Sequence, residues 1–257
     1  MFFKYLYNLS AERRNPRPDR HLGCLLAFVA GAVNTGGFLA LGDFTSHMTG
    51  IVSGMADSLA VGNQMLALTA LGALVAFLLG AATTAGLIHW ARRHQLRSQY
   101  ALSILLEAAL LVLFSVVGTY LSILHTGMVS FTVLLLCYVM GLQNAIITEV
   151  TSGSIRTTHV TGLATDLGIE LGKLLYFNRR NLPKLHVLAN RKKIKLHTLL
   201  ISFFFVGGLA GAYGFNYIGY ASSTILAALL VLIAAGPIGQ DLRLRLRGYR
   251  RRPLAIQ

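Results

Sequence analysis

Apolar residues in this chain are gathered into long runs that short polar segments separate. Six runs hold about 20 residues or more, the length that an α-helix needs to cross roughly 30 Å of hydrocarbon. These runs cover residues 22–41, 66–90, 101–124, 129–150, 198–217 and 218–238. The pattern predicts an all-α polytopic membrane protein, and a share of only 12% charged residues agrees with it.

Two shorter apolar runs, residues 47–61 and 159–177, lie in near-copies of one stretch, residues 31–62 and 141–172. The copies share Gly-x-x-Asn at an offset of 110 and His-x-Thr-Gly at an offset of 112. The matched pairs are Gly31 and Gly141, Asn34 and Asn144, His47 and His159, Thr49 and Thr161, and Gly50 and Gly162. Each copy is broken midway by polar residues. A break repeated at corresponding places of two halves indicates a binding site in a transporter-like membrane protein.

The positions of the basic residues indicate the membrane topology. There are 23 Lys and Arg against nine Asp and Glu, and 21 of the 23 lie beside the predicted spans. They occupy residues 1–21, 92–97, 178–196 and 241–257. Under the positive-inside rule, the N-terminal segment (1–21) and the tail (241–257) are expected to be cytoplasmic. The basic loops are expected to contact anionic lipid headgroups, and nucleic-acid binding is not expected.

If all four basic segments are cytoplasmic, the chain crosses an even number of times between successive segments. Two of the intervening stretches hold three apolar runs each, so the short broken run in each should fail to cross. The prediction is one membrane domain, 22–240, with six full spans and two re-entrant segments, 44–61 and 151–177. Its halves, 22–124 and 129–238, are then inverted repeats of three spans each. Seven or eight plain spans are the alternative.

The two breaks carry the candidate site. Non-helical backbone at membrane depth is tolerated where protein or a water-filled cavity satisfies its amides. Ser or Thr before each short run can cap a helix whose N–H groups and positive dipole end favour an anion. Two such ends, meeting near the midplane, would hold a small polar or anionic solute. The candidate binding residues are Asn34, His47, Thr49, Gly50, Asn144, Thr158, His159, Thr161 and Gly162.

Two residue types in this set have a competing interpretation. The glycines have the spacing of a close helix interface, Gly50 with Gly54 and Gly168 with Gly172, and packing is the favoured interpretation for them. The asparagines either bond the exposed backbone of the breaks or contact the solute directly, and both alternatives stay open.

Ionisable residues inside a membrane domain are functional candidates, because burying an unpaired charge is costly. Glu149, Asp166 and Glu170 are candidates for charge or proton coupling. Asp166 and Glu170 lie one helical turn apart with Lys173 in reach, so a charge pair at the cytoplasmic mouth is the competing interpretation. Glu107 is expected to pair with Arg97 or to lie at the N-terminus of its helix.

No catalytic constellation is present in the sequence. It has no HExxH, GxSxG or phosphate-loop motif. Cys24 and Cys137 stand alone in apolar runs without metal-ligand spacing. We therefore expect no cofactor, no metal and no enzyme activity.

The two broken stretches resemble a known family. GAVNTGGFLALGDFTSHMTG and GLQNAIITEVTSGSIRTTHVTGLATDLGIELG are similar to motifs of the YoaK-like family of bacterial membrane proteins, a domain of unknown function. The resemblance implies an integral protein of the bacterial inner membrane and names no substrate. Two positions depart from the family pattern: Asn34 stands where Asp is common, and Ile51 where Asn is common.

The leading hypothesis is a secondary transporter or permease whose small solute lies between the two breaks. The second hypothesis is a non-transporting membrane scaffold or partner-binding subunit, in which the broken segments only pack. An intramembrane enzyme is the third. The sequence leaves the solute, the coupling ion and an oligomeric state open.

Overall fold

The computed structural model describes residues 16–41, 45–96, 98–121, 129–151, 158–176 and 186–250, and all regular structure in these ranges is helical. The α-helices are α2 (Pro16–Leu41), α3 (Met48–Ala60), α4 (Gln64–Arg93), α5 (Ala101–Leu121), α6 (Val129–Val150), α7 (Val160–Leu175), α8 (Arg191–Tyr217) and α9 (Ser222–Arg250). A 3-10 turn, η2 (Gly219–Ala221), joins α8 to α9.

Six of the described helices, α2, α4, α5, α6, α8 and α9, are long and apolar enough to cross a membrane. Helices α3 and α7, with 13 and 16 residues, are shorter than a full span requires. The expectation of an all-α, multi-pass membrane protein is confirmed. The central parts of both predicted breaks, 42–44 and 152–157, lie outside the described residues.

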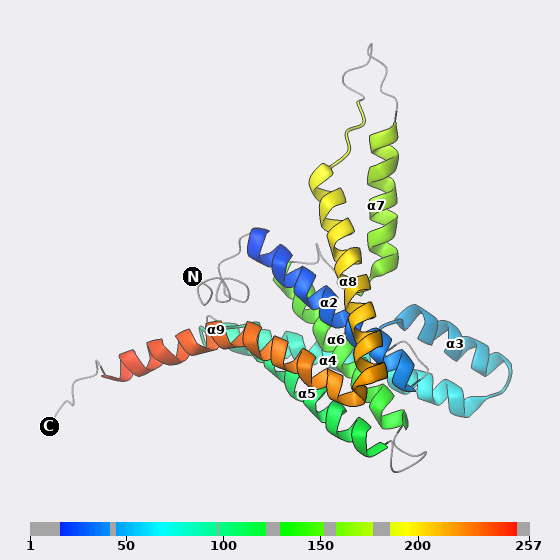
Figure 1. The fold of residues 1–257 in the computed structure, drawn as a ribbon, viewed down its shortest axis with the longest axis horizontal. Helices are drawn as coiled ribbons and strands as arrows, with labels where there is room; N and C mark the ends of the chain where they lie inside the picture. The colour runs from blue at the N-terminus through cyan, green and yellow to red at the C-terminus, as the bar shows by residue number, and fades with distance from the viewer. Residues whose placement is uncertain are drawn as a thin grey trace.

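Two helical hairpins project from a common bundle (Figure 1). One consists of α3 and the start of α4, and the other of α7 and the start of α8. Most of the fully buried apolar side chains belong instead to α2, α5, α6 and α9, for example Leu26, Leu111, Met140 and Leu230. The hairpins therefore place the two short helices at the edge of a packed core.

Side-chain and backbone contacts give the relative directions of the spans. Helices α2 and α8 run in the same direction, and so do α4 and α6. The pairs that show this are Phe28 with Gly207, Ala32 with Gly211, Gly72 with Leu134, and Thr84 with Leu142. Helices α2 and α6 run in opposite directions, because Gln143 donates to the carbonyl of Leu26 while Gly37 lies against Leu136.

The same close packing occurs twice in the molecule. Gly80 of α4 lies against the carbonyl oxygen of Tyr138 in α6, and Gly207 of α8 lies against that of Phe28 in α2. Phe28 and Tyr138 are 110 positions apart, and Gly80 and Gly207 are 127 apart. The reciprocal contacts recur as well: Gly31 with Phe204, and Gly141 with Phe77. We call these the glycine crossings, since a Cβ at any of the four glycines would overlap backbone of the facing helix.

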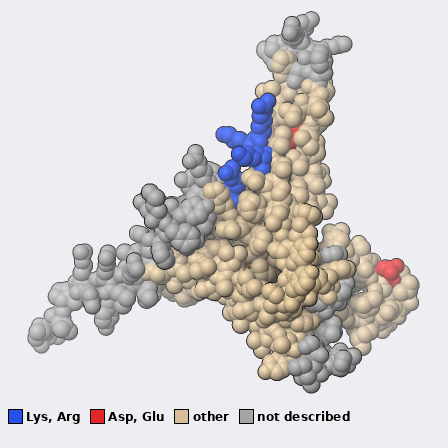
Figure 2. All heavy atoms as spheres, viewed as in Figure 1, with Lys and Arg blue, Asp and Glu red and all other residues tan. Residues whose placement is uncertain are grey.

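The described parts of the basic segments lie at one end of the bundle. Arg92, near the end of α4, forms an ion pair with Glu149 near the end of α6 (3.2 Å). Ser98, just before α5, donates its backbone N–H and its hydroxyl to Asp241 of α9 (2.9 and 2.6 Å). Because α2 and α8 run opposite to α6, they start at this same end. Figure 2 shows the Lys and Arg side chains of the α8 start gathered there.

Candidate functional site

Both short helices begin in the same way. Their N-cap residues are His47 for α3 and His159 for α7, and neither side chain makes a capping hydrogen bond. The carbonyls of these residues accept the first helical bonds, from Ile51 and Leu163 (3.1 and 3.0 Å). The expected Ser or Thr caps are therefore replaced by histidines, and the hydroxyl residues just before them have another role.

That role is to attach each break to a mid-span asparagine. Asn34 Oδ1 accepts hydrogen bonds from the backbone N–H (3.2 Å) and the hydroxyl (2.8 Å) of Ser46. In the second copy, Asn144 Oδ1 accepts from the hydroxyl of Thr158 (2.6 Å). The Asn144 amide also donates to the carbonyl of Met140 (2.9 Å). This geometry supports the first interpretation of the asparagines, in which they bond the broken segments.

Substituting Asn34 by Ala should destabilise the first break. The change removes two hydrogen bonds, so the free energy of unfolding should fall by about 1–2 kcal/mol. Ser46→Ala removes one of them and should cost less. In a double-mutant cycle measured by thermal or denaturant unfolding, the two losses should be less than additive. Fully additive losses would contradict a direct Asn34–Ser46 interaction.

The glycines of the breaks do not pack helices against one another. A Cβ on Gly50 would meet the ring of His47, and a Cβ on Gly162 would meet the ring of His159. Around Gly54, Gly168 and Gly172 a Cβ would meet nothing within 4 Å. Their spacing predicts a close helix interface, but in the structure these glycines do not lie against another helix of the chain. Gly50 and Gly162 instead leave space for the histidine ring over the first turn.

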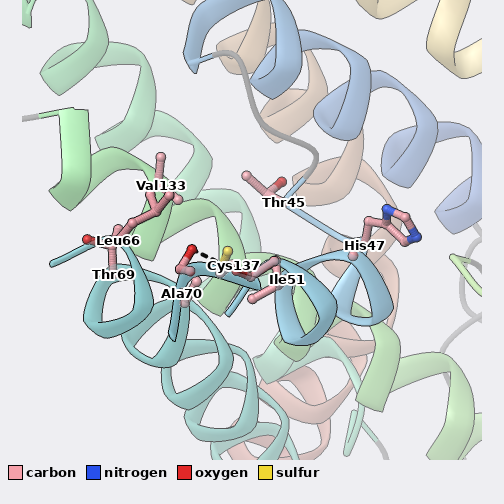
Figure 3. A pocket seen from close by; sticks show the side chains of 12 residues that line it. Thr45, His47, Ile51, Leu66, Thr69, Ala70, Val133 and Cys137 are labelled. Atoms are coloured by element: carbon pink, nitrogen blue, oxygen red, sulfur yellow. Dashed lines mark hydrogen bonds between the residues drawn. The ribbon is translucent and has the colours of Figure 1, made fainter. Parts of the chain in front are cut away.

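A cavity of about 370 Å³ lies beside the first break, between α3, the start of α4 and the start of α6 (Figure 3). This volume is within the range of small-molecule sites. The polar residues of its lining are Thr45, His47, Ser58, Thr69 and Cys137. The remaining lining residues are glycine or apolar, and none is Lys, Arg, Asp or Glu.

The hydroxyl groups of the lining differ in their bonding. Ser58 donates to the carbonyl of Gly54 (2.7 Å) and Thr69 to that of Met65 (3.0 Å), so these two oxygens offer lone pairs to a guest. Thr45 is only 1% exposed, and its hydroxyl has no hydrogen-bond partner in the described part of the chain. Buried polar groups are normally hydrogen-bonded. The Thr45 hydroxyl is therefore the group of this lining at which we expect a bound solute to form a hydrogen bond.

The structure separates the predicted residues of the first break. Gly50 lines the cavity, and His47 lies at its edge with the ring turned away from Thr69 and Cys137 (Figure 3). Thr49 is exposed and outside the lining. Thr45 was missed by sequence reasoning, although it stands two positions before the repeated histidine. No residue of the second break lines this cavity.

At the second break the equivalent positions hold charged residues. The offset of 112 relates Gly54 to Asp166 and Ser58 to Glu170, and the offset of 127 relates Leu66 to Lys193, Ala70 to His197 and Ala73 to Leu200. These pairs follow from aligning the two hairpins with each other. The asparagines that cap α4 and α8, Asn63 and Asn190, are also 127 positions apart. The small residues that leave space in the first hairpin are thus replaced by large and charged ones in the second.

These charged residues are paired with one another. Lys193 contacts Asp166 (3.2 Å), and Lys173 contacts Glu170 (2.9 Å). The backbone N–H of Asn190 also donates to Glu170 (2.7 Å). This bond and the one from Lys173 hold the pKa of Glu170 below its ordinary range. With Glu149 paired to Arg92, each of the three predicted coupling carboxylates has a basic partner.

His197 is a further residue that the sequence did not single out. It is 3% exposed, and its Nε2 lies 4.0 Å from a carboxylate oxygen of Asp166. Its Nδ1 has no hydrogen-bond partner among the described residues. The repeat offset of 127 could have found it, but that offset is visible only after the helices are aligned in space. His159 and Thr161 are exposed at the start of α7.

Comparison with known proteins gives one result. No curated protein and no solved structure matches the chain. A family model described as "protein of unknown function (DUF1275)" matches residues 22–236, which include all six candidate spans except the ends of the first and last. The expected membership of a membrane-protein family without an assigned function agrees with this match. The chain belongs to the DUF1275 family.

Proposed function

We propose that this protein is a permease that binds a small solute in the cavity beside the first break. The observation that carries the proposal is the hydroxyl of Thr45, buried and without a described partner, in the lining of a cavity at a broken membrane segment. Substrate sites in many transporters lie where membrane helices are discontinuous. The asparagine bonds to Ser46 and Thr158 would hold the two breaks in place.

The chemistry of the lining favours an uncharged solute over an anion. An anion would be expected to meet Lys or Arg, and the lining contains neither. Ser58 and Thr69 use their protons on helix carbonyls, so they accept hydrogen bonds from a guest. A small polar molecule with N–H or O–H donors and a compact apolar part fits this arrangement.

The architecture of inverted repeats belongs to this proposal. It is supported by the opposite directions of α2 and α6, and by the two equivalent glycine crossings that join the halves, α4 with α6 and α8 with α2. The short lengths of α3 and α7 support their assignment as re-entrant segments that do not cross. In such proteins, transport proceeds by movement of one repeat against the other around the site.

The location in the membrane is also a proposal. Arg92 and the basic residues at the start of α8 lie at one end of the bundle. By the positive-inside rule this supports a cytoplasmic position for that end and for both termini. The resemblance to the YoaK-like family supports the bacterial inner membrane. Contact of the basic residues with anionic lipid headgroups would follow from the same placement.

A ligand screen by thermal unfolding tests the function. The purified protein in detergent is heated with a panel of small uncharged amides, polyols and nucleobases, and separately with nitrate, phosphate and other anions. A solute present at 100 times its dissociation constant should stabilise the protein by about 2.7 kcal/mol. At least one uncharged solute should raise the unfolding temperature of the wild type.

Two threonines provide a matched pair for this screen. Thr45→Val removes the buried hydroxyl and should abolish the stabilisation, whereas Thr49→Val changes an exposed residue outside the lining and should preserve it. Stabilisation by anions alone would contradict the uncharged solute class. If no compound acts, the non-transporting scaffold becomes the better hypothesis.

A further inference from the structure

Glu107 differs from the other described carboxyl groups. Glu149, Asp166 and Glu170 have basic partners, Asp241 accepts hydrogen bonds from Ser98, and Asp57 is exposed at the surface. Glu107 is 0% exposed, and neither of its carboxyl oxygens has a hydrogen-bond partner in the described ranges. It lies within α5, one of the six candidate spans.

The surroundings of Glu107 are largely apolar. Its helix neighbours Ile104, Ala108 and Leu111 are buried members of the main hydrophobic core. Ser103, one turn earlier on the same face, is also fully buried, and its hydroxyl has no partner in the described part of the chain. Nothing near Glu107 on its own helix can therefore neutralise a negative charge.

The charged groups of the elements packed against α5 are engaged elsewhere. Arg92 of α4 bonds to Gln99, Tyr100 and Glu149. Tyr100 is seven residues before Glu107, which is about 10 Å along a helix. Arg93 and His89 of α4 are exposed, and neither is a hydrogen-bond partner of the Glu107 carboxyl oxygens.

The other titratable groups on these elements bond to other residues or contact α5 far from Glu107. On α9, Asp241 bonds to Ser98, which precedes the first residue of α5, whereas Glu107 is the seventh residue of that helix. On α6, the hydroxyl of Tyr138 donates to Thr83. Tyr220 of η2 lies against Gly118, eleven residues beyond Glu107. No described cation is thus at the level of Glu107.

We infer that Glu107 is a proton-binding site in the core of the bundle. An ionised carboxylate buried in apolar surroundings without a partner is so unfavourable that the group takes up a proton instead. The packed bundle holds the neutral carboxylic acid, and separation of α5 from α6 or α9 would admit water and release the proton. In the proposed permease this makes Glu107 the coupling group; that role rests on the proposed function, whereas proton binding does not.

Infrared difference spectroscopy tests the protonation directly. The wild-type protein in lipid vesicles at neutral pH should show the carbonyl band of a protonated carboxylic acid, shifted by deuterium exchange. Glu107→Gln, an uncharged isostere, should remove this band, and Glu107→Asp should shift it. Glu149→Gln is the matched control, because Glu149 is half-exposed and paired with Arg92, and it should leave the band unchanged.

Labelling with dicyclohexylcarbodiimide provides a second measurement. The carboxylic acid O–H adds across one C=N bond of this apolar reagent, and the product rearranges to a stable N-acylurea that mass spectrometry locates. Glu107 should be labelled, and less so as the pH rises, while Asp166 and Glu170 should not.

Three outcomes overturn the inference. One is an infrared band that persists unchanged in Glu107→Gln, whatever the labelling shows. Another is labelling of the paired carboxylates with Glu107 left unmodified. The third is protection of Glu107 by sodium chloride but not by potassium chloride, since that result assigns the site to a sodium ion. Because none of these measurements involves a solute, failure of the permease proposal leaves their interpretation intact.

Discussion

Substituting Gly80 or Gly207 by alanine should lower the unfolding temperature substantially, and by similar amounts. At each position the new Cβ would overlap a backbone carbonyl oxygen of the facing helix, Tyr138 for Gly80 and Phe28 for Gly207. Backbone cannot yield as a side-chain tip does, so the helices must separate. Overpacking of this kind typically costs about 1–3 kcal/mol. The similarity of the two losses follows because the same contact occurs twice between the halves, once for α4 on α6 and once for α8 on α2.

Double substitutions make this prediction sharper. Gly80 and Gly141 lie at the same glycine crossing, so once α4 and α6 have separated the second alanine should cost less than it does alone. Gly80 and Gly207 lie at different crossings, so their losses should add. Gly54→Ala and Gly86→Ala are matched controls with open space around the new Cβ, and neither should reduce stability. Equal losses at the controls would contradict the packing argument.

Filling the cavity should abolish ligand binding without harming the fold. Ala73 is buried in α4 and lines the cavity beside the first break. At the equivalent position of the second hairpin the chain has Leu200, which is fully buried. Ala73→Leu should therefore be accommodated with an unfolding temperature equal to or above that of the wild type. The stabilisation by the solute found in the screen, about 2.7 kcal/mol at 100 times its dissociation constant, should disappear.

Ala82→Leu is the control for this substitution, because Ala82 is on the same helix but exposed and away from the cavity. It should keep the full ligand response. If Ala73→Leu retained the response, the solute would bind elsewhere and the cavity would lose its assigned role. A large loss of stability in Ala73→Leu would contradict the equivalence of the two hairpins.

Much of the fold follows from the apolar pattern. The predicted run 129–150 coincides with α6, and the short runs 47–61 and 159–177 differ from α3 and α7 by one or two residues at each end. For the matched asparagines the sequence left bonding of the breaks and contact with a solute open, and in the structure both bond residues of the breaks. Boundaries were less accurate where helices continue into basic sequence, as at Arg191, since Lys and Arg are good helix formers and do not end a helix.

The chemistry of the site was harder to predict, because burial and pairing depend on tertiary contacts. Glu107 was expected to pair with Arg97, which lies outside the described residues, or to lie at the N-terminus of its helix; instead it is the seventh residue of α5 and fully buried. Asp166 and Glu170 were expected to serve in charge or proton coupling or to form a charge pair with Lys173 in reach, and the sequence did not indicate that Lys193 pairs with Asp166 from another helix. His197 carries no sequence signal that distinguishes it from neighbouring residues, and the repeat of Thr45 at Thr157 does not show that Thr45 is buried without a partner. Only the aligned hairpins show that Ala70 and His197 occupy the same place.

The packing of helices from one half against helices of the other half has a consequence for synthesis. The first helix of each half packs against the second long helix of the other half, α2 on α8 and α6 on α4, through Gly31, Gly80, Gly141 and Gly207. When α2, α4 and α5 have entered the membrane, the glycine faces of α2 and α4 still lack the helices that will cover them. Assembly must wait until nearly the whole chain has been made. Neither half is therefore a folding unit by itself. A chain truncated before α8 should be degraded by the proteases that remove misassembled membrane proteins.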